Sequence, residues 1–215
     1  MKTELLIDVL ARGAGPAPRA FVARRLASAP APAVCAGLLA STALALGWIG
    51  PVPAAMLSAP PLWIKLAYGG ALAVAAAWLA GRLARPAASY RAAAAGVVLV
   101  VGCMALIGGA SLLGMPATER LPALLGSSWL SCPWSVLGLS LPALAATLWA
   151  LRGLAPTRPR LAGFAAGLLA GALGAFGYAL ACSEISPAFV AVWYSAGIVI
   201  TALLGAALGP RVLRW

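Results

Sequence analysis

Six long stretches of apolar residues dominate the pattern of hydrophobic and polar positions, and short segments rich in Pro, Gly and Arg separate them. They cover residues 33–50, 62–81, 92–114, 134–151, 161–181 and 189–209. A helix needs roughly 20 mostly apolar residues to cross about 30 Å of hydrocarbon, and helix-breaking residues bound each stretch. The pattern therefore predicts an all-α, integral membrane bundle of six transmembrane helices over residues 31–215, preceded by a short helical segment within residues 1–30.

The composition excludes most other classes of protein. Of the 215 residues, 63% are hydrophobic and 9% are charged, which leaves too little polar surface to coat a soluble globule. The chain has no histidine and only four acidic residues, so it holds almost no material for acid–base catalysis. We therefore expect a protein that is not an enzyme, has no catalytic residues and carries no permanent cofactor.

The basic residues predict the orientation. With six spans both termini share one side of the membrane, and that side holds 13 of the 15 Lys and Arg residues, leaving Lys65 and Arg120 opposite. The connecting loops are short, so the positive-inside rule applies to them. The sequence thus predicts that both termini are cytoplasmic in a multi-pass protein of a bacterial inner membrane.

The first thirty residues are the only sizeable segment outside the spans. Thr3 is a suitable cap for a short helix ending near Arg12, on which Leu6, Val9 and Leu10 form an apolar patch. So short a helix is marginal in water, so we expect something to cover the patch. The lipid surface, the chain's own bundle and a groove on a cytoplasmic partner protein are the three alternatives.

Two cysteines are predicted to lie at the same membrane level, opposite the cytoplasm. Cys132 precedes the fourth span and Cys182 follows the fifth, and Glu184 is two residues further along. In an oxidising periplasm this pair is suited to a static disulfide, to a redox switch, or to a soft-metal site with Glu184 as an oxygen donor. Two unconnected thiols are the remaining alternative. Cys35 and Cys103 fall inside spans, where we expect small apolar packing residues.

Small residues recur in the fifth span. Gly163, Gly167 and Gly171 are spaced four residues apart and therefore lie on one helix face. Such a face lets helix backbones approach closely. Packing within one bundle is the favoured interpretation, and a homodimer face is the alternative.

Several strings in the sequence carry a resemblance to a known family. They are MKTELLIDVLA at the amino terminus, GSSWLSC ending at Cys132, YALACSEISPAFVAVWYSAGI around Cys182, and LGPRVLRW at the carboxyl terminus. In order and spacing these strings resemble the negative regulator of sigma-F family. The resemblance implies a multi-pass inner-membrane anti-sigma factor whose amino-terminal segment sequesters an extracytoplasmic-function sigma factor. It also implies that Cys132 and Cys182 take part in releasing the sigma factor under metal or oxidative stress.

The resulting hypothesis is a regulator with a sigma factor and the lipid bilayer as partners, without direct contact to nucleic acid. Leu6, Val9 and Leu10 are its expected sigma-binding residues, and Cys132, Cys182 and Glu184 its expected sensing residues. A transient soft-metal ion at Cys132 and Cys182 and a homo-oligomer are compatible with it. The alternative is a small-solute or metal transporter that uses the two cysteines as the ligand pair where its cargo enters. No ionisable residue lies in the middle of a span, which weakens that alternative.

Overall fold

The computed structural model describes Thr3, Ile7, Asp8 and residues 30–85, 88–154 and 156–213. All regular elements within the bundle are helical, as the sequence predicted. The long helices are α3 (Pro30–Trp48), α5 (Pro60–Leu83), α6 (Arg91–Leu113), α8 (Cys132–Arg152), α9 (Pro159–Ala179) and α11 (Ser195–Val212). Shorter helices are α4 (Ala54–Leu57), α7 (Ala117–Leu125) and α10 (Pro187–Phe189), and a π-helical turn, η1 (Val190–Tyr194), joins α10 to α11.

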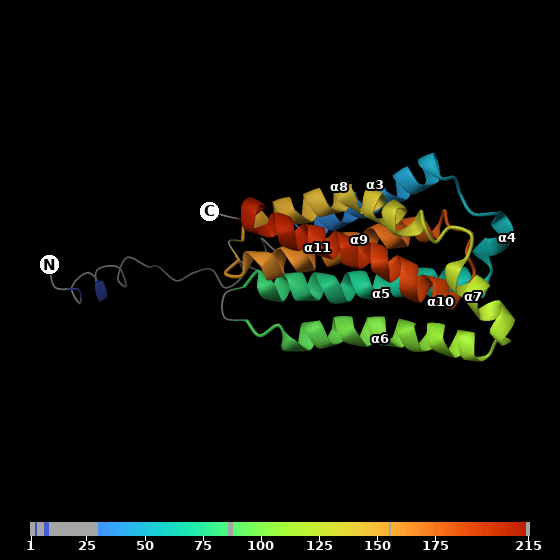
Figure 1. The fold of residues 1–215 in the computed structure, drawn as a ribbon. Helices are drawn as coiled ribbons and strands as arrows, with labels where there is room; N and C mark the ends of the chain where they lie inside the picture. The colour runs from blue at the N-terminus through green and yellow to red at the C-terminus, as the bar shows by residue number, and fades with distance from the viewer. Residues whose placement is uncertain (1–2, 4–6, 9–29, 86–87, 155, 214–215) are drawn as a thin grey trace.

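The long helices run side by side and alternate in direction (Figure 1). The connections from α5 to α6 and from α8 to α9, together with the end of α11, lie at one end of the bundle, which we call the arginine end. Helices α4, α7 and α10 lie at the opposite end, where α8 begins at Cys132 and α9 leads into Cys182, and we call this the cysteine end.

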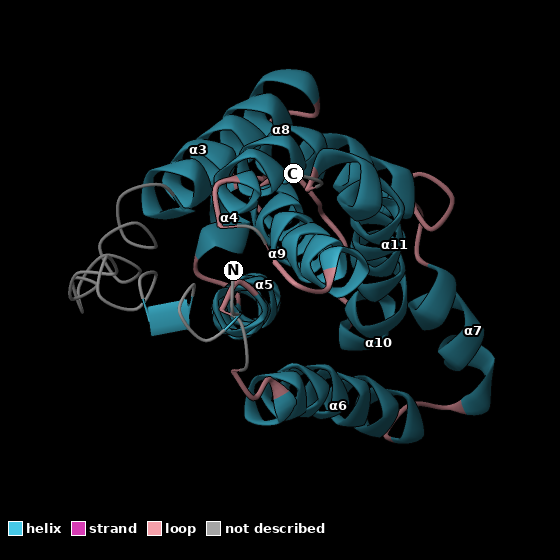
Figure 2. Ribbon diagram, turned by 90° about the vertical axis from the view of Figure 1, so that its left-hand side faces the viewer, coloured by secondary structure: helices cyan, strands magenta, loops and turns pink. Residues whose placement is uncertain are grey.

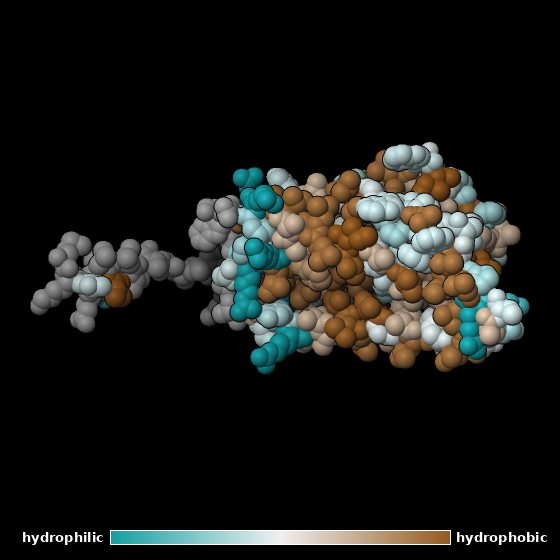
Figure 3. Space-filling model, viewed as in Figure 1, coloured by the Kyte–Doolittle hydropathy of each residue, from teal (hydrophilic) through white to brown (hydrophobic). Residues whose placement is uncertain are grey.

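Five helical segments are long and apolar enough to cross a membrane, and they match five of the six predicted spans. They are Pro60–Leu83, Arg91–Leu113, Cys132–Arg152, Pro159–Ala179 and Pro187–Val212. The first predicted span corresponds to α3, whose fully described apolar part, Val34–Trp48, is shorter than such a segment. Brown, apolar side chains cover the middle of the molecule, and hydrophilic ones gather toward its ends (Figure 3). The chain is therefore suited to membrane insertion, while a sixth crossing stays a prediction.

Helix α9 is the centre of the bundle. Helices α3, α5, α8 and α11 surround it, and nearly all of its side chains are buried (Figure 2). The glycine face that the sequence indicated packs against α11, where a Cβ atom on Gly171 would lie 2.9 Å from the Cα of Ile198. Further along α9, a Cβ on Gly174 would lie 2.8 Å from the Cβ of Ser140. The glycines thus serve packing within one bundle, the favoured of the two interpretations.

Buried hydroxyl groups connect helices that cross the apolar interior. The Ser41 hydroxyl of α3 donates a 2.7 Å hydrogen bond to the carbonyl oxygen of Leu139 in α8. Ser140 of α8 and Thr201 of α11 share a 3.0 Å hydrogen bond. Such bonds support helix association where lipid supplies no hydrophobic driving force.

Helix α6 lies at the edge of the bundle, beside α5 and α10 (Figure 2). Its buried residues among those described are Ala93, Met104 and Gly108, and most of its other side chains are exposed. Cys103 is exposed on this helix, and Cys35 is exposed on α3. The expectation that these two cysteines are packing residues of the interior is therefore wrong, because apolar spans do not reveal which face meets lipid.

Candidate functional site

The two cysteines singled out in the sequence lie together at the cysteine end. Cys132 is the first residue of α8 and is fully buried, and Cys182 follows α9 and is 4% exposed. Neither cysteine is in a disulfide in this structure, and both side chains are buried.

Glu184 anchors the loop before Cys132 to the loop after α9. Its Oε1 atom accepts hydrogen bonds from the backbone N–H and the hydroxyl of Ser127, at 2.8 and 2.6 Å. It also accepts from the backbone N–H and the hydroxyl of Ser128, at 3.1 and 3.0 Å. Gly126 precedes these serines with a φ of +59°, and a Cβ there would lie 2.6 Å from Glu184 Oε2. The string GSS therefore forms a binding site for one carboxylate oxygen of Glu184, which the sequence did not predict.

The same contacts explain the ionisation of Glu184. Partial burial opposes the charged form, but the hydrogen bonds from Ser127 and Ser128 together outweigh it and hold the pKa below its ordinary value. A carboxyl group with a lowered folded-state pKa stabilises the fold at pH values above its unfolded pKa. That stabilisation is lost as the pH falls through the folded-state pKa. The loop contact should therefore weaken below about pH 4.3, where a free glutamate titrates.

We expect acidification from pH 6 to pH 4 and below to destabilise the wild-type chain more than a Glu184→Gln variant, which lacks the charged acceptor. Glu184 is largely solvent-screened, so the expected difference in the thermal midpoint is only about 2–4 °C, the shift of about 1 kcal/mol in a chain of this size. Thermal unfolding in detergent at a series of pH values measures it. Glu119→Gln removes an exposed glutamate from α7 and is the matched control. Equal pH responses of wild type and Glu184→Gln would contradict the anchoring role.

Lys65 is a member of this site that sequence reasoning treated only as a charge near a span end. A lysine at that position is expected to extend toward the aqueous interface. Instead it is 1% exposed, and its Nζ donates a 2.7 Å hydrogen bond to the carbonyl oxygen of Cys182. Helix α5 is thereby tied to the segment that carries Cys182.

Two aromatic hydroxyl groups complete the cluster. The rings of Tyr178 and Tyr194 lie 5.5 Å apart, and the backbone N–H of Cys182 donates a 2.9 Å hydrogen bond to the carbonyl oxygen of Tyr178. Tyr194 is fully buried, and its hydroxyl has no hydrogen-bonding partner in the described part of the chain. Tyr194 ends the π-helical turn η1, a local conformation often found at functional sites.

The cluster contains few metal ligands. Among the described residues no group of three or more His, Cys, Asp and Glu side chains is arranged to hold a metal ion. The carboxylate of Glu184, the proposed oxygen donor, has one oxygen occupied by Ser127 and Ser128. What the site offers is a pair of buried thiols beside an ammonium group, at the junction of α5, α8 and α9. A change in the thiols would act directly on that junction.

The predicted sigma-binding residues Leu6, Val9 and Leu10 lie outside the described residues. Of the predicted amino-terminal helix, the structure describes Thr3, Ile7 and Asp8, and all three are helical.

Comparisons with known proteins bear on the whole chain. The family model described as negative regulator of sigma F matches residues 10–215. The chain is 40% identical to the anti-sigma-F factor NrsF of Caulobacter vibrioides and 40% identical to the probable anti-sigma-F factor NrsF of Azospira oryzae. Both alignments cover 100% of this chain and 100% of the relative. No solved structure matches the chain.

These relatives are named as regulators and not as enzymes. The match covers both cysteine-bearing loops and every helix of the bundle. The resemblance found in the sequence is confirmed, and the chain belongs to the family of negative regulators of sigma F.

Proposed function

We propose that this chain is an anti-sigma factor of a bacterial inner membrane that sequesters an extracytoplasmic-function sigma factor and releases it under metal or oxidative stress. The observation that carries the proposal is the 40% identity, over both full lengths, to a protein named as an anti-sigma-F factor. A sigma factor is accordingly the partner. The apolar helices support a protein held in the membrane.

The proposed topology has six spans with both termini in the cytoplasm. The arginine end carries Arg82, Arg91, Arg152, Arg158 and Arg160, while Lys65 and Arg120 belong to the cysteine end. This asymmetry supports a cytoplasmic arginine end and a periplasmic cysteine end. The amino-terminal segment, residues 1–30, then lies on the side where a sigma factor is found.

The proposed sensing step takes place at Cys132 and Cys182. Oxidation joins the two thiols in a disulfide and transfers two electrons and two protons to the oxidant, whereas a soft metal ion displaces the thiol protons. Either change alters a buried pair of cysteines whose surroundings are held by the hydrogen bond of Lys65 to Cys182 and by those of Ser127 and Ser128 to Glu184. The junction of α5, α8 and α9 then repacks, and the amino-terminal segment loses its hold on the sigma factor.

The release step is tested with the full chain copurified with its sigma factor. On addition of cadmium ions or a thiol oxidant, we expect the wild type to release the sigma factor and a Cys132→Ser, Cys182→Ser variant to retain it. A Cys35→Ser, Cys103→Ser variant makes the same chemical change at two exposed cysteines and should behave as the wild type does. Moving the equilibrium between the bound and the released sigma factor from 1:99 to 99:1 takes roughly 5.5 kcal/mol. The Cys132→Ser, Cys182→Ser variant lacks the reaction that would supply this free energy, so it should retain nearly all of its sigma factor.

Two results would contradict parts of the proposal. Failure of the wild-type chain to copurify with any sigma factor would refute the anti-sigma function itself. Normal release by the Cys132→Ser, Cys182→Ser variant would refute sensing at these cysteines and leave the anti-sigma function intact.

A further inference from the structure

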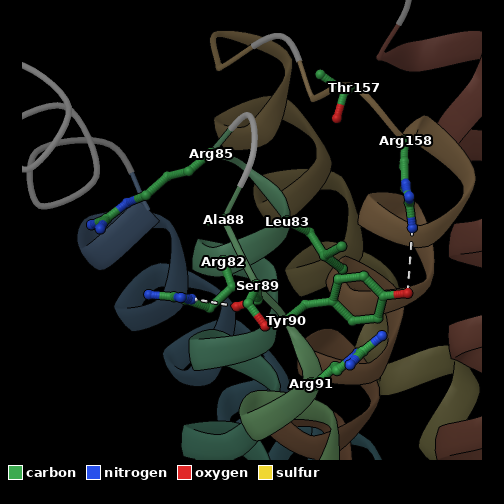
Figure 4. A pocket seen from close by; sticks show the side chains of 9 residues that line it. All are labelled: Arg82, Leu83, Arg85, Ala88, Ser89, Tyr90, Arg91, Thr157 and Arg158. Carbon is green, nitrogen blue, oxygen red and sulfur yellow. Dashed lines mark hydrogen bonds between the residues drawn. The ribbon is translucent and has the colours of Figure 1, made fainter.

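A cavity of about 390 Å³ opens at the arginine end, between the connection from α5 to α6 and the start of α9 (Figure 4). Four arginines contribute to its wall: Arg82, Arg85, Arg91 and Arg158. Tyr90 and Ser89 lie between them, and none of the lining residues is acidic. The two acidic side chains outside the amino-terminal segment, Glu119 and Glu184, belong to the cysteine end. Among the described residues, the cavity wall is therefore a concentration of positive charge with no acidic side chain.

Neutral groups hold two of these arginines in place. The Arg82 Nε donates a 2.7 Å hydrogen bond to the carbonyl oxygen of Ser89. The Arg158 guanidinium donates a 3.3 Å hydrogen bond to the Tyr90 hydroxyl and lies 5.7 Å from the centroid of that ring. A guanidinium carries five N–H donors, so one such bond each leaves most donors available to a ligand. Guanidinium groups are planar donors that suit the oxygens of a phosphate.

A second cavity, apolar and of about 480 Å³, lies between α3, α5, α8 and α9. Val34, Ala77, Gly81, Leu151 and Leu169 are among the residues that line it. Arg85 lines both cavities, and in Figure 4 its side chain extends away from Arg158 toward the helix drawn in blue, α3. The basic cavity and the apolar groove are thus neighbours that share Arg85.

We propose that the two cavities together bind one anionic phospholipid, with its phosphate among the arginines and an acyl chain in the apolar groove. The inference rests on the proposed placement of the chain in a membrane. Basic pockets between transmembrane helices are a known way to hold anionic headgroups. A free phosphate or an acidic protein segment would use the arginines but would leave the groove beside Arg85 unfilled. The lipid is the ligand that accounts for both cavities.

Such a lipid would connect three parts of the chain at the end nearest the sigma factor. Arg82 lies in the last turn of α5 and Arg85 follows that helix, Arg91 begins α6, and Arg158 precedes α9. A bound phosphate would hold these three helix ends at fixed separations. The lipid is therefore expected to stabilise the end of the bundle from which the amino-terminal segment extends.

Native mass spectrometry of the full chain in detergent tests the inference, with phosphatidylglycerol as the anionic probe and phosphatidylcholine as the neutral one. We expect phosphatidylglycerol to be retained and phosphatidylcholine to be lost. An Arg85→Gln, Arg91→Gln, Arg158→Gln variant should bind phosphatidylglycerol at least about tenfold more weakly. An Arg152→Gln, Arg160→Gln, Arg211→Gln variant loses the same charge at the same end, outside the cavity, and should bind as the wild type does.

The groove is tested separately with Ala77→Phe, which fills it from an exposed position on α5. We expect it to weaken the binding of long-chain phosphatidylglycerol, and Ala105→Phe, on an exposed position of α6, to leave it unchanged. Circular dichroism and size-exclusion chromatography check that each variant is folded, so that lost binding is not lost structure.

Three results would overturn the inference. Equal losses of phosphatidylglycerol binding in the two triple-arginine variants would show that general surface charge, and not the cavity, attracts the lipid. Displacement of the lipid by millimolar inorganic phosphate would make the cavity a site for a soluble anion. Lost sigma-factor binding in the cavity variant, with phosphatidylglycerol retained, would make it a protein-docking site. The lipid measurement needs no sigma factor, so lipid binding can be found even if the anti-sigma proposal fails. In the same way, sigma-factor binding can be found even if no lipid is bound.

Discussion

A Gly167→Leu substitution is expected to prevent α9 from packing against α11 and to destabilise the bundle by at least about 3 kcal/mol. A Cβ atom at Gly167 would contact the carbonyl oxygen of Thr201 and would lie 2.7 Å from the Cα of Ala202. Those are backbone atoms of a helix, so no side-chain rotation relieves the overlap. The contact between α9 and α11 is the most extensive between any two described helices. Pushing these two helices apart would therefore disturb the packing of the whole core. Unfolding in increasing concentrations of a denaturing detergent measures the loss.

Gly138→Leu is the matched control. Gly138 lies in the middle of α8, on a face where no atom stands within 4 Å of an added Cβ. The same residue types are exchanged in a helix of the same length, so both variants gain the same apolar volume. We expect the control to unfold within about 0.5 kcal/mol of the wild type, as substitutions away from packed features usually do. Similar losses in both variants would show that α9 and α11 do not form the close contact described.

The spans were predictable because membrane insertion requires long apolar segments. Helices α5, α6, α8 and α9 begin and end within a few residues of the predicted stretches, and the sixth stretch corresponds to α10, η1 and α11 together, Pro187–Val212. Their inward faces were harder to predict, because apolar residues cover the whole circumference and periodicity carries no signal. Only the glycines of α9 marked a buried face in advance. Helix α7 was missed, because its nine residues lie between spans and are only partly apolar.

The cysteine site was predicted in part. The argument from span lengths placed Cys132 and Cys182 at one end of adjacent helices, and the structure has them there. The Lys65 contact joins residues 117 positions apart, and the Glu184 contact with Ser127 joins residues 57 apart. No local pattern encodes such pairs. A charged residue at the end of an otherwise apolar span, beside a cysteine-bearing loop, was the available signal for Lys65.

The arginine cavity was not apparent from the sequence. The basic residues of the α5–α6 and α8–α9 connections were interpreted as orientation signals, and each fits that role alone. What the sequence does not reveal is that the two connections meet, so that Arg158 reaches Tyr90 across 68 positions. The arginines of the two connections thus form one concentrated site.

A Leu6→Asp, Leu10→Asp variant of the full chain is expected to bind the sigma factor at least about a hundredfold more weakly than the wild type. The two leucines share one face of the predicted amino-terminal helix, and a short helix of this kind is ordered mainly by what covers its apolar face. If the leucines bind in a hydrophobic groove on the sigma factor, two carboxylates in their place are desolvated and unpaired there. Copurification of the tagged chain with the sigma factor from membranes, quantified against the wild type, measures the loss.

An Ala11→Asp, Ala14→Asp variant adds the same two charges outside the apolar patch and should retain the sigma factor. This pair of variants separates the contact face from the net charge of the segment, because both carry two more carboxylates than the wild type. Retention by the Leu6→Asp, Leu10→Asp chain would move the binding site to the loops at the arginine end of the bundle. The arginine cavity would then be the next surface to test, since it lies at the same end. Loss in both variants would instead indicate that the positive charge of the segment, rather than its leucines, holds the partner.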